Sequence, residues 1–94
     1  MENKAYILSF DRNPAWDYKI LHEGIKSDPN IVTWSHYMLS SYILISKQSG
    51  KVLGEGIMRY FPDHRFLLTQ VKLSNKWGLL NKDAWEWIDK YKNI

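Results

Sequence analysis

The chain contains no cysteine, and it has no apolar run near the roughly 20 residues that a membrane-spanning helix needs. The first absence excludes disulfides, thiolate zinc sites and a cysteine nucleophile. The polar start, Met1-Glu2-Asn3-Lys4, lacks the basic region and apolar run of a signal peptide. Together these features predict a cytoplasmic protein that meets no membrane.

What is present fits a single small domain spanning residues 1–94. Apolar residues make up 45% of the chain, and aromatic residues make up 15%, with five Trp and six Tyr. Large rings bury much surface per residue and are enriched at interfaces. The formal charge of +3 permits contact with nucleic acid but does not require it.

The first half of the chain predicts a strand, a helix and two more strands. Residues 4–11 are apolar on both faces, which is typical of a central strand. Asn13-Pro14 is a helix start signal, so a helix is expected over Ala15 to Ser27, ending before Asp28-Pro29-Asn30. Residues 31–46 are rich in β-branched and aromatic side chains and must contain a reversal, which we place near Leu39-Ser40.

The second half predicts a short helix, a strand and a final helix. Residues 52–60 favour a short helix despite Gly54 and Gly56. Arg65 to Leu73 alternates like a strand, and Asn81 is a cap for a helix over Lys82 to Lys92. This order predicts an α+β, ferredoxin-like (βαββαβ) sandwich with an added C-terminal helix.

Such a fold covers one sheet face with two helices and leaves the other face bare. We expect Tyr18, Leu21 and Ile25 beneath the covered face. Apolar Phe66 and Leu68, opposite Leu67, suggest that the bare face meets a second copy, giving a homodimer. The alternative is that the Trp-rich C-terminal helix folds back over this face.

Several segments, taken together, resemble one bacterial family. They are Phe10-Asp11, Trp16-Asp17-Tyr18, Leu21, Ile25-Lys26, the run from Trp34 and His36 through Leu39 to Ser41-Tyr42, Asp63, Phe66-Leu67-Leu68, Trp77-Gly78-Leu79-Leu80 and Trp85. Over roughly residues 5–88 the chain is similar to the small SinR-like proteins, which are related to the CRISPR-associated Cas-two-like family of defence proteins. It departs from them in having Phe10-Asp11-Arg12 where the family has Tyr-Asp-Leu, and Asn13-Pro14-Ala15 at the Pro-Gly loop.

The resemblance implies a ferredoxin-like homodimer whose first-strand aspartates face each other across a cleft. In Cas-two-like relatives these aspartates are assigned to divalent metal binding in a nuclease, while other members bind nucleic acid without catalysis. Asp11 is the residue that carries over to this metal position. A Mg²⁺ ion would suit it, because Mg²⁺ takes one or two carboxylates and keeps its waters. The alternative is that Asp11 caps the following helix or starts an Asx turn.

His36 is the second candidate catalytic residue. It alternates with Trp34 and Met38 on a predicted strand, and its ordinary pKa near 6.5 suits a general base or a phosphate contact. A half-buried, hydrogen-bonded histidine is the alternative. His22 and His64 are predicted to lie at the surface, and the three histidines are too scattered to indicate a zinc site.

Five basic residues are candidates for contact with nucleic-acid phosphates, with Tyr and Trp as stacking partners. They are Arg12, Lys19, Lys26, Arg59 and Arg65. They come from separate elements, so a solvated basic surface is the alternative interpretation.

Three functions follow from these patterns. The first is a nucleic-acid-binding Cas-two-like protein, which as an enzyme would be a Mg²⁺-dependent endonuclease acting on RNA or DNA. The second is a non-enzymatic binding module for a protein or nucleotide partner, such as a phage or mobile-element anti-defence factor. The third is a metal-free ribonuclease that uses His36.

Overall fold

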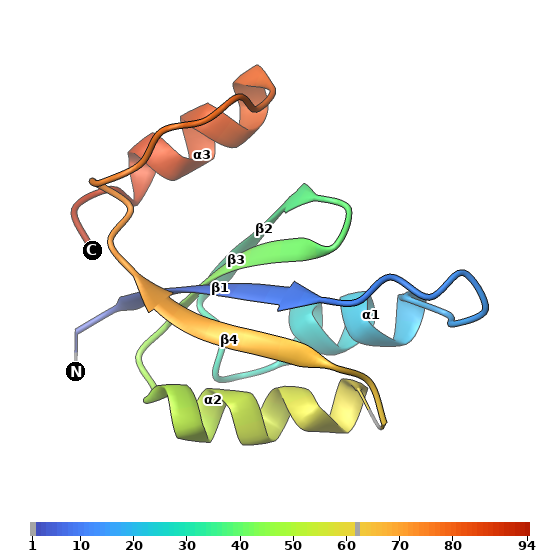
Figure 1. Cartoon of the computed structure of the whole chain (residues 1–94). Helices are drawn as coiled ribbons and strands as arrows, with labels where there is room; N and C mark the ends of the chain where they lie inside the picture. The colour runs from blue at the N-terminus through green and yellow to red at the C-terminus, as the bar shows by residue number, and fades with distance from the viewer. Residues whose placement is uncertain (1, 62) are drawn as a thin grey trace.

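The computed structural model describes residues 2–61 and 63–94 and has an α+β architecture. Within these residues, an antiparallel sheet of four strands, in the order β2-β3-β1-β4, carries three helices (Figure 1). The elements in chain order are β1 (Lys4–Phe10), α1 (Lys19–Ser27), β2 (Thr33–Met38), β3 (Ser41–Ser46), α2 (Gly50–Ile57) with a 3-10 turn (Met58–Tyr60), β4 (Phe66–Val71) and α3 (Lys82–Lys90).

In the described part of the chain, no helix has the length and apolar character to cross a membrane.

The β1 strand lies in the middle of the sheet, as its sequence predicted. Leu8 pairs with Tyr42 of β3 on one side and with Leu68 of β4 on the other. Ala5, Tyr6 and Leu8 are all buried, so both faces of the strand are covered. The predicted reversal also lies where expected, because residues 39 and 40 form the turn between β2 and β3.

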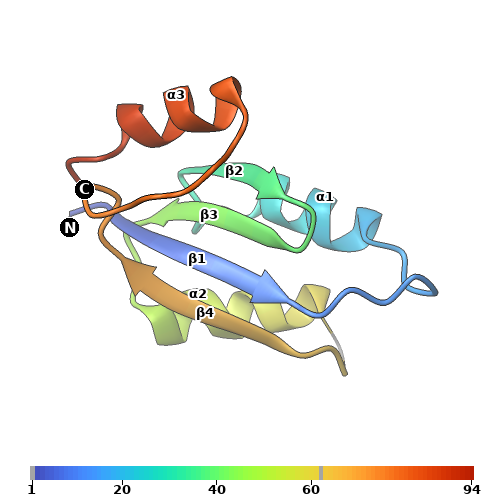
Figure 2. The same ribbon diagram turned by 45° about the horizontal axis from the view of Figure 1, so that its top comes forward.

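The sheet has a core on each face. The first core joins β1 and β3 to α1 and α2 through side chains such as Leu8, Leu44 and Leu53, together with Leu21 and Ile25 of α1. The second core joins the opposite face to the C-terminal segment, and its buried members are Ala5, Ile43, Ile45, Leu73 and Ile88. Figures 1 and 2 show α1 and α2 on one side of the sheet and α3 on the other. The C-terminal helix therefore folds back over the second face.

The α1 helix begins at Lys19, four residues later than the expected start at Ala15. The Asn13 side chain instead accepts a hydrogen bond from the Ala15 amide, and the Trp16 amide donates a hydrogen bond to the Asn13 carbonyl. Asp17 in turn accepts from the amide of Lys19. These local bonds hold residues 13–17 in a turn, because short polar side chains compete with helical bonding.

Two other expected elements are shorter than predicted. The α3 helix ends at Lys90 rather than Lys92, because Tyr91 leaves the helical conformation as its C-cap. The β4 strand covers Phe66–Val71 rather than residues 65–73. The Asn81 cap is confirmed, since its side chain accepts from the Ala84 amide at 2.9 Å.

The sheet face assigned to Phe66 and Leu68 was wrong. Both side chains are half-buried and pack against the first core beneath the helices. Leu67 points to the opposite face and is 66% exposed, since successive strand residues alternate. Any apolar contact with a second copy would therefore involve Leu67 rather than its two neighbours.

Candidate functional site

A hollow opens at the carboxyl end of β1, where the loop after β1 meets the segment before β4. Its lining comprises Asp11, Arg12, Asn13, Pro14, Asp63, His64 and Arg65. A neighbouring hollow shares Asp63, His64 and Arg65, and adds Arg59 and Glu55 from α2 and the turn that follows. These two hollows bring together residues that lie more than 40 positions apart, such as Asp11 and Arg65, which are separated by 54.

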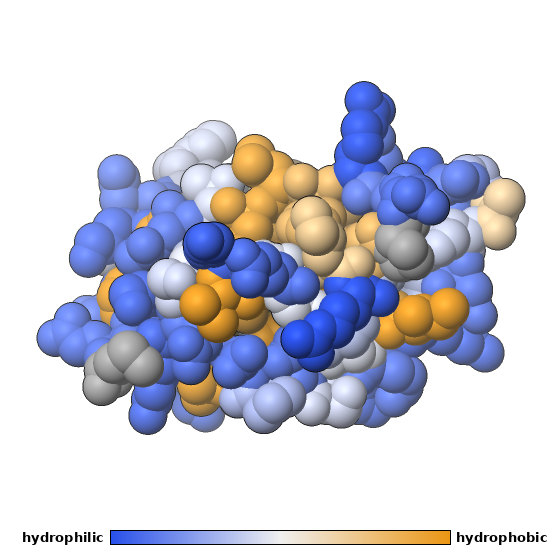
Figure 3. All heavy atoms as spheres, turned by 90° about the horizontal axis from the view of Figure 1, so that it is seen from below, coloured by the Kyte–Doolittle hydropathy of each residue, from blue (hydrophilic) through white to orange (hydrophobic). Residues whose placement is uncertain are grey.

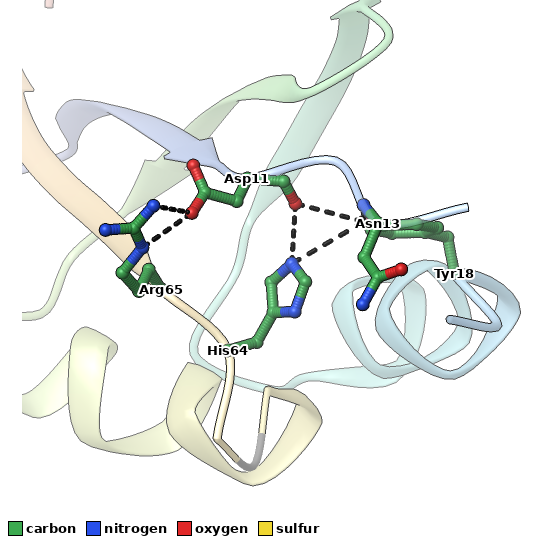
Figure 4. Close-up of polar contacts among 5 residues, drawn as sticks. All are labelled: Asp11, Asn13, Tyr18, His64 and Arg65. Carbon is green, nitrogen blue, oxygen red and sulfur yellow. Dashed lines mark hydrogen bonds and ion pairs between the residues drawn. The ribbon is translucent and has the colours of Figure 1, made fainter. Parts of the chain in front are cut away.

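Asp11 is held by Arg65. The Nε and Nη2 atoms of Arg65 each lie 2.6 Å from Oδ2 of Asp11 (Figure 4). The Asp11 amide also donates to the carbonyl of Arg65 at 3.3 Å. The local turn and cap interactions expected of Asp11 are made by Asn13 and Asp17 instead. Asp11 thus closes the end of the sheet, with its charge balanced by one arginine.

The backbone oxygen of Asp11 orients two further side chains. It accepts a hydrogen bond from the Tyr18 hydroxyl at 3.0 Å and one from Nε2 of His64 (Figure 4). Because a carbonyl can only accept, Nε2 of His64 carries the hydrogen, and in the neutral ring Nδ1 carries the lone pair. His64 is half-buried here, although the sequence placed it at the surface.

Aromatic rings gather around His64. The rings of Trp16 and His64 are nearly parallel, at 16°, with centroids 4.8 Å apart. Phe61 lies against both, at 5.2 Å from each centroid. We call Trp16, Phe61 and His64 the Trp16 platform. Trp16 and His64 are half-buried, so the platform combines a fixed orientation with some accessible ring surface.

Three of the five predicted basic residues lie around this platform. Arg59 and Arg65 line the second hollow, and the Arg12 guanidinium lies 4.3 Å from the Tyr18 ring centroid. Lys19 and Lys26 belong to α1 and line neither hollow. Lys26 instead lies 3.9 Å from Glu23.

Carboxylates offset the three arginines. Asp11, Asp63 and Glu55 line the same two hollows, so arginines and acidic residues are equal in number there. The site is therefore polar and charged without a strong excess of one sign. Among residues 2–61 and 63–94, no group of three His, Asp or Glu side chains gathers in a way that could hold a metal ion.

His36 lies in a separate cluster. It is exposed on β2 and stacks on Tyr42 with ring centroids 4.2 Å apart and a 6° interplanar angle. Its Nε2 donates to the Leu39 carbonyl at 3.1 Å. Tyr42 in turn contacts Phe10, with ring centroids 6.2 Å apart, and Phe10 precedes Asp11 in the chain. The structure thus does not combine His36 and Asp11 into one site.

His22 belongs to the His36 cluster, which the sequence did not predict. Its Nδ1 lies 2.9 Å from the Tyr42 hydroxyl, and its ring centroid lies 6.2 Å from that of His36. Burial raises the pKa of Tyr42 to about 12, so this hydroxyl stays protonated at neutral pH. The position of His22 between Leu21 and Ile25 gave a partial signal, because it places the ring at the border of the apolar stripe.

Comparison with family models, with curated proteins and with solved structures gives no match for this chain. The similarity to SinR-like and Cas-two-like proteins therefore stays a prediction from the sequence.

Proposed function

We propose that this protein binds single-stranded nucleic acid at the carboxyl end of β1. The observation that carries the proposal is the arrangement of Arg12, Arg59 and Arg65, from three separate segments, around the Trp16 platform. Arginine suits phosphate because its planar guanidinium donates two parallel hydrogen bonds. Aromatic rings accept any base by stacking, which makes such sites tolerant of sequence.

The Asp11–Arg65 ion pair sets how phosphate enters this site. Arg65 is 88% exposed as a side chain, so it can turn toward a ligand without opening the core. A phosphate that takes Arg65 must replace the carboxylate of Asp11, and this exchange costs part of the binding free energy. We therefore expect modest affinity and a shallow dependence on salt, since few net counterions are released.

We also assign the chain to the ferredoxin-like fold with an added C-terminal helix. The element order through β4 supports this assignment, and so does the strand order β2-β3-β1-β4. The fold agrees with the function proposed here but does not decide it, because one fold hosts many activities.

Fluorescence anisotropy with a short single-stranded RNA and the matching DNA tests the proposal. Arg65→Gln should weaken binding, because it removes a phosphate donor. Asp11→Asn should strengthen binding, because it releases Arg65 and removes a repelling charge. Lys26→Gln is the matched control, since it removes a positive charge outside both hollows. Absence of binding at low salt, or equal weakening by Arg65→Gln and Lys26→Gln, would overturn the proposal.

A Mg²⁺-dependent endonuclease with Asp11 as the metal ligand is the second candidate. It is supported by the position of Asp11 at the end of a buried strand, where the backbone is held in place. It requires Arg65 to leave Asp11 and a second carboxylate from another copy. Asp11→Asn separates the two functions, because it should abolish Mg²⁺-dependent cleavage in an enzyme and strengthen binding in a binding protein.

We propose that the protein forms a homodimer through the open part of the second sheet face. Leu67 is 66% exposed there, and the loop before α3 exposes Trp77 (99%) and Leu79 (96%). Exposed apolar groups of this size are typical of partner contacts. Sedimentation at micromolar concentration should give a dimer, and Trp77→Ser with Leu79→Ser should give a monomer. A monomer before any substitution would contradict the proposal and favour a different protein partner on this face.

A further inference from the structure

A cavity of about 310 Å³ lies between the second face of the sheet and the segment that joins β4 to α3. Its floor comes from the second core, through Ile7 of β1, Ile43 of β3 and Ile88 of α3. Trp77 and Leu79 of the joining segment also line it, and because both are almost fully exposed they form its rim. Figures 1 and 2 show α3 and this segment on the side of the sheet away from α1 and α2. The cavity is therefore separate from the Asp11 end, and the nucleic-acid binding proposed above does not use it.

The wall of this cavity carries a single charge. Of the described residues that line it, only Lys76 is charged, and the others are apolar or aromatic apart from Gly78. Tyr37 presents its ring, because its hydroxyl is already hydrogen-bonded to Oγ of Ser41 at 2.8 Å. The α2 side of the molecule differs, since it mixes hydrophilic and apolar surface (Figure 3) and its hollow is lined by charged residues such as Arg59.

Lys76 is held so that its ammonium group can take a second anion. Its side chain is only 24% exposed, so the hydrocarbon stem lies against the apolar wall while the charged end reaches Asp89. The Nζ atom of Lys76 lies 3.6 Å from Oδ1 of Asp89, which is beyond hydrogen-bond distance. Asp89 is 60% exposed and does not line the cavity. The ammonium therefore keeps N–H donors for another carboxylate.

We propose that this cavity binds a small apolar organic acid. The hydrocarbon part packs against Ile7, Ile43 and Ile88, and the carboxylate pairs with Lys76. The volume lies at the lower end of the range for small-molecule sites, about 300–1,000 Å³, and such sites combine apolar walls with a few polar groups that fix orientation. A nucleotide fits this wall poorly, because its several charges and polar groups would be buried without partners.

Calorimetric titration of the full chain with 2-naphthoate, and with the uncharged 2-naphthylmethanol, tests the site. We expect 2-naphthoate to bind with a dissociation constant below about 1 mM and the alcohol to bind more weakly. Lys76→Gln should weaken 2-naphthoate binding by about ten-fold or more, as for loss of a hydrogen bond to a charged group, and leave the alcohol unaffected. Asp89→Asn should strengthen it by up to about five-fold, because it removes a competing carboxylate. Lys72→Gln is the matched control, since it removes an exposed positive charge outside the cavity.

A second measurement locates the ligand without any substitution. In the unchanged protein, 2-naphthoate should shift the methyl NMR signals of Ile7 and Ile43 and leave those of Ile25 and Ile57, which belong to the first core, in place. Absence of binding at about 1 mM, equal affinity for the acid and the alcohol, or equal weakening by Lys72→Gln and Lys76→Gln would overturn the proposal. So would Ile7 and Ile43 signals that follow protein concentration rather than 2-naphthoate, because a second copy would then fill the cavity.

Discussion

Arg65 places its Nε and Nη2 atoms each 2.6 Å from the same carboxylate oxygen of Asp11, and so joins the start of β4 to the end of β1. Both side chains remain largely in water, at 88% and 55% exposure. Exposed pairs of this kind add little to stability, because solvent screens them and holding two side chains costs entropy. The pair is thus well suited to exchange one anion for another.

A double-mutant cycle of Asp11→Ala and Arg65→Ala should therefore give a coupling free energy of about 0.2–1 kcal/mol. Urea unfolding of the four proteins measures it. A coupling well above this range would mean that the pair fixes the sheet end, and it would argue against release of Arg65 to a ligand.

Leu21 and Ile20 are adjacent on α1 but differ sharply in burial. Leu21 is 1% exposed within the first core, as the sequence predicted, and Ile20 is 56% exposed. Leu21→Ala should lower the free energy of unfolding by about 2–5 kcal/mol, because it leaves a cavity. Ile20→Ala should change it by only about 0.5 kcal/mol, as surface substitutions do. Equal effects in urea unfolding would contradict the arrangement of α1 against the sheet.

Two helical glycines should respond to alanine in opposite directions. A methyl group at Gly54 would lie 3.8 Å from Leu68, an ordinary contact, so Gly54→Ala should stabilise α2 by about 1 kcal/mol through helix propensity. A methyl group at Gly24 would overlap the Tyr60 ring, so Gly24→Ala should destabilise the protein by about 1–3 kcal/mol. Thermal unfolding of both variants checks the signs, and stabilisation by Gly24→Ala would mean that Tyr60 does not pack there.

The sequence predicted the sheet and helices well because their signals are local. The apolar β run from Tyr42 to Ile45, the Asn81 cap and the break at Asp28-Pro29 each act within a few residues. The start of α1 was missed because Asn13-Pro14 supports either a helix or a turn, and the side-chain bonds of Asn13 and Asp17 decide between them. The alternation of side chains along β4 showed that Phe66 and Leu68 share one face and that Leu67 lies on the other. It did not show which of these two faces the helices α1 and α2 cover.

The candidate sites were predicted less well because their contacts are long-range. Tyr18 and His64 meet across 46 positions, and Asp11 and Arg65 across 54. Periodicity within one element carries no information on such pairs. Three of the five basic candidates converge because the turn before β4 returns to the end of β1, whereas Lys19 and Lys26 remain on α1. The pairing of His22 with His36 likewise depends on how α1 packs over β2 and β3.

Tyr42 should make the folded protein less stable at alkaline pH. Burial raises its pKa from 10.0 to about 12 in the folded protein. Between these values the unfolded chain binds fewer protons than the folded chain, so the free energy of unfolding falls as pH rises. The stabilising contribution is complete below pH 10 and is lost progressively up to about pH 12, with an upper limit of roughly 2–3 kcal/mol.

Tyr42→Phe isolates this contribution, because it keeps the ring and removes the titrating hydroxyl. Burial also raises the pKa of Tyr6 and Tyr60, and both remain in the variant, so their effects cancel in the comparison. Urea unfolding from pH 8 to 11 should show a steeper loss of stability in the unchanged protein than in Tyr42→Phe. Parallel curves would mean that the Tyr42 hydroxyl is solvated, and that it does not hold His22 as described.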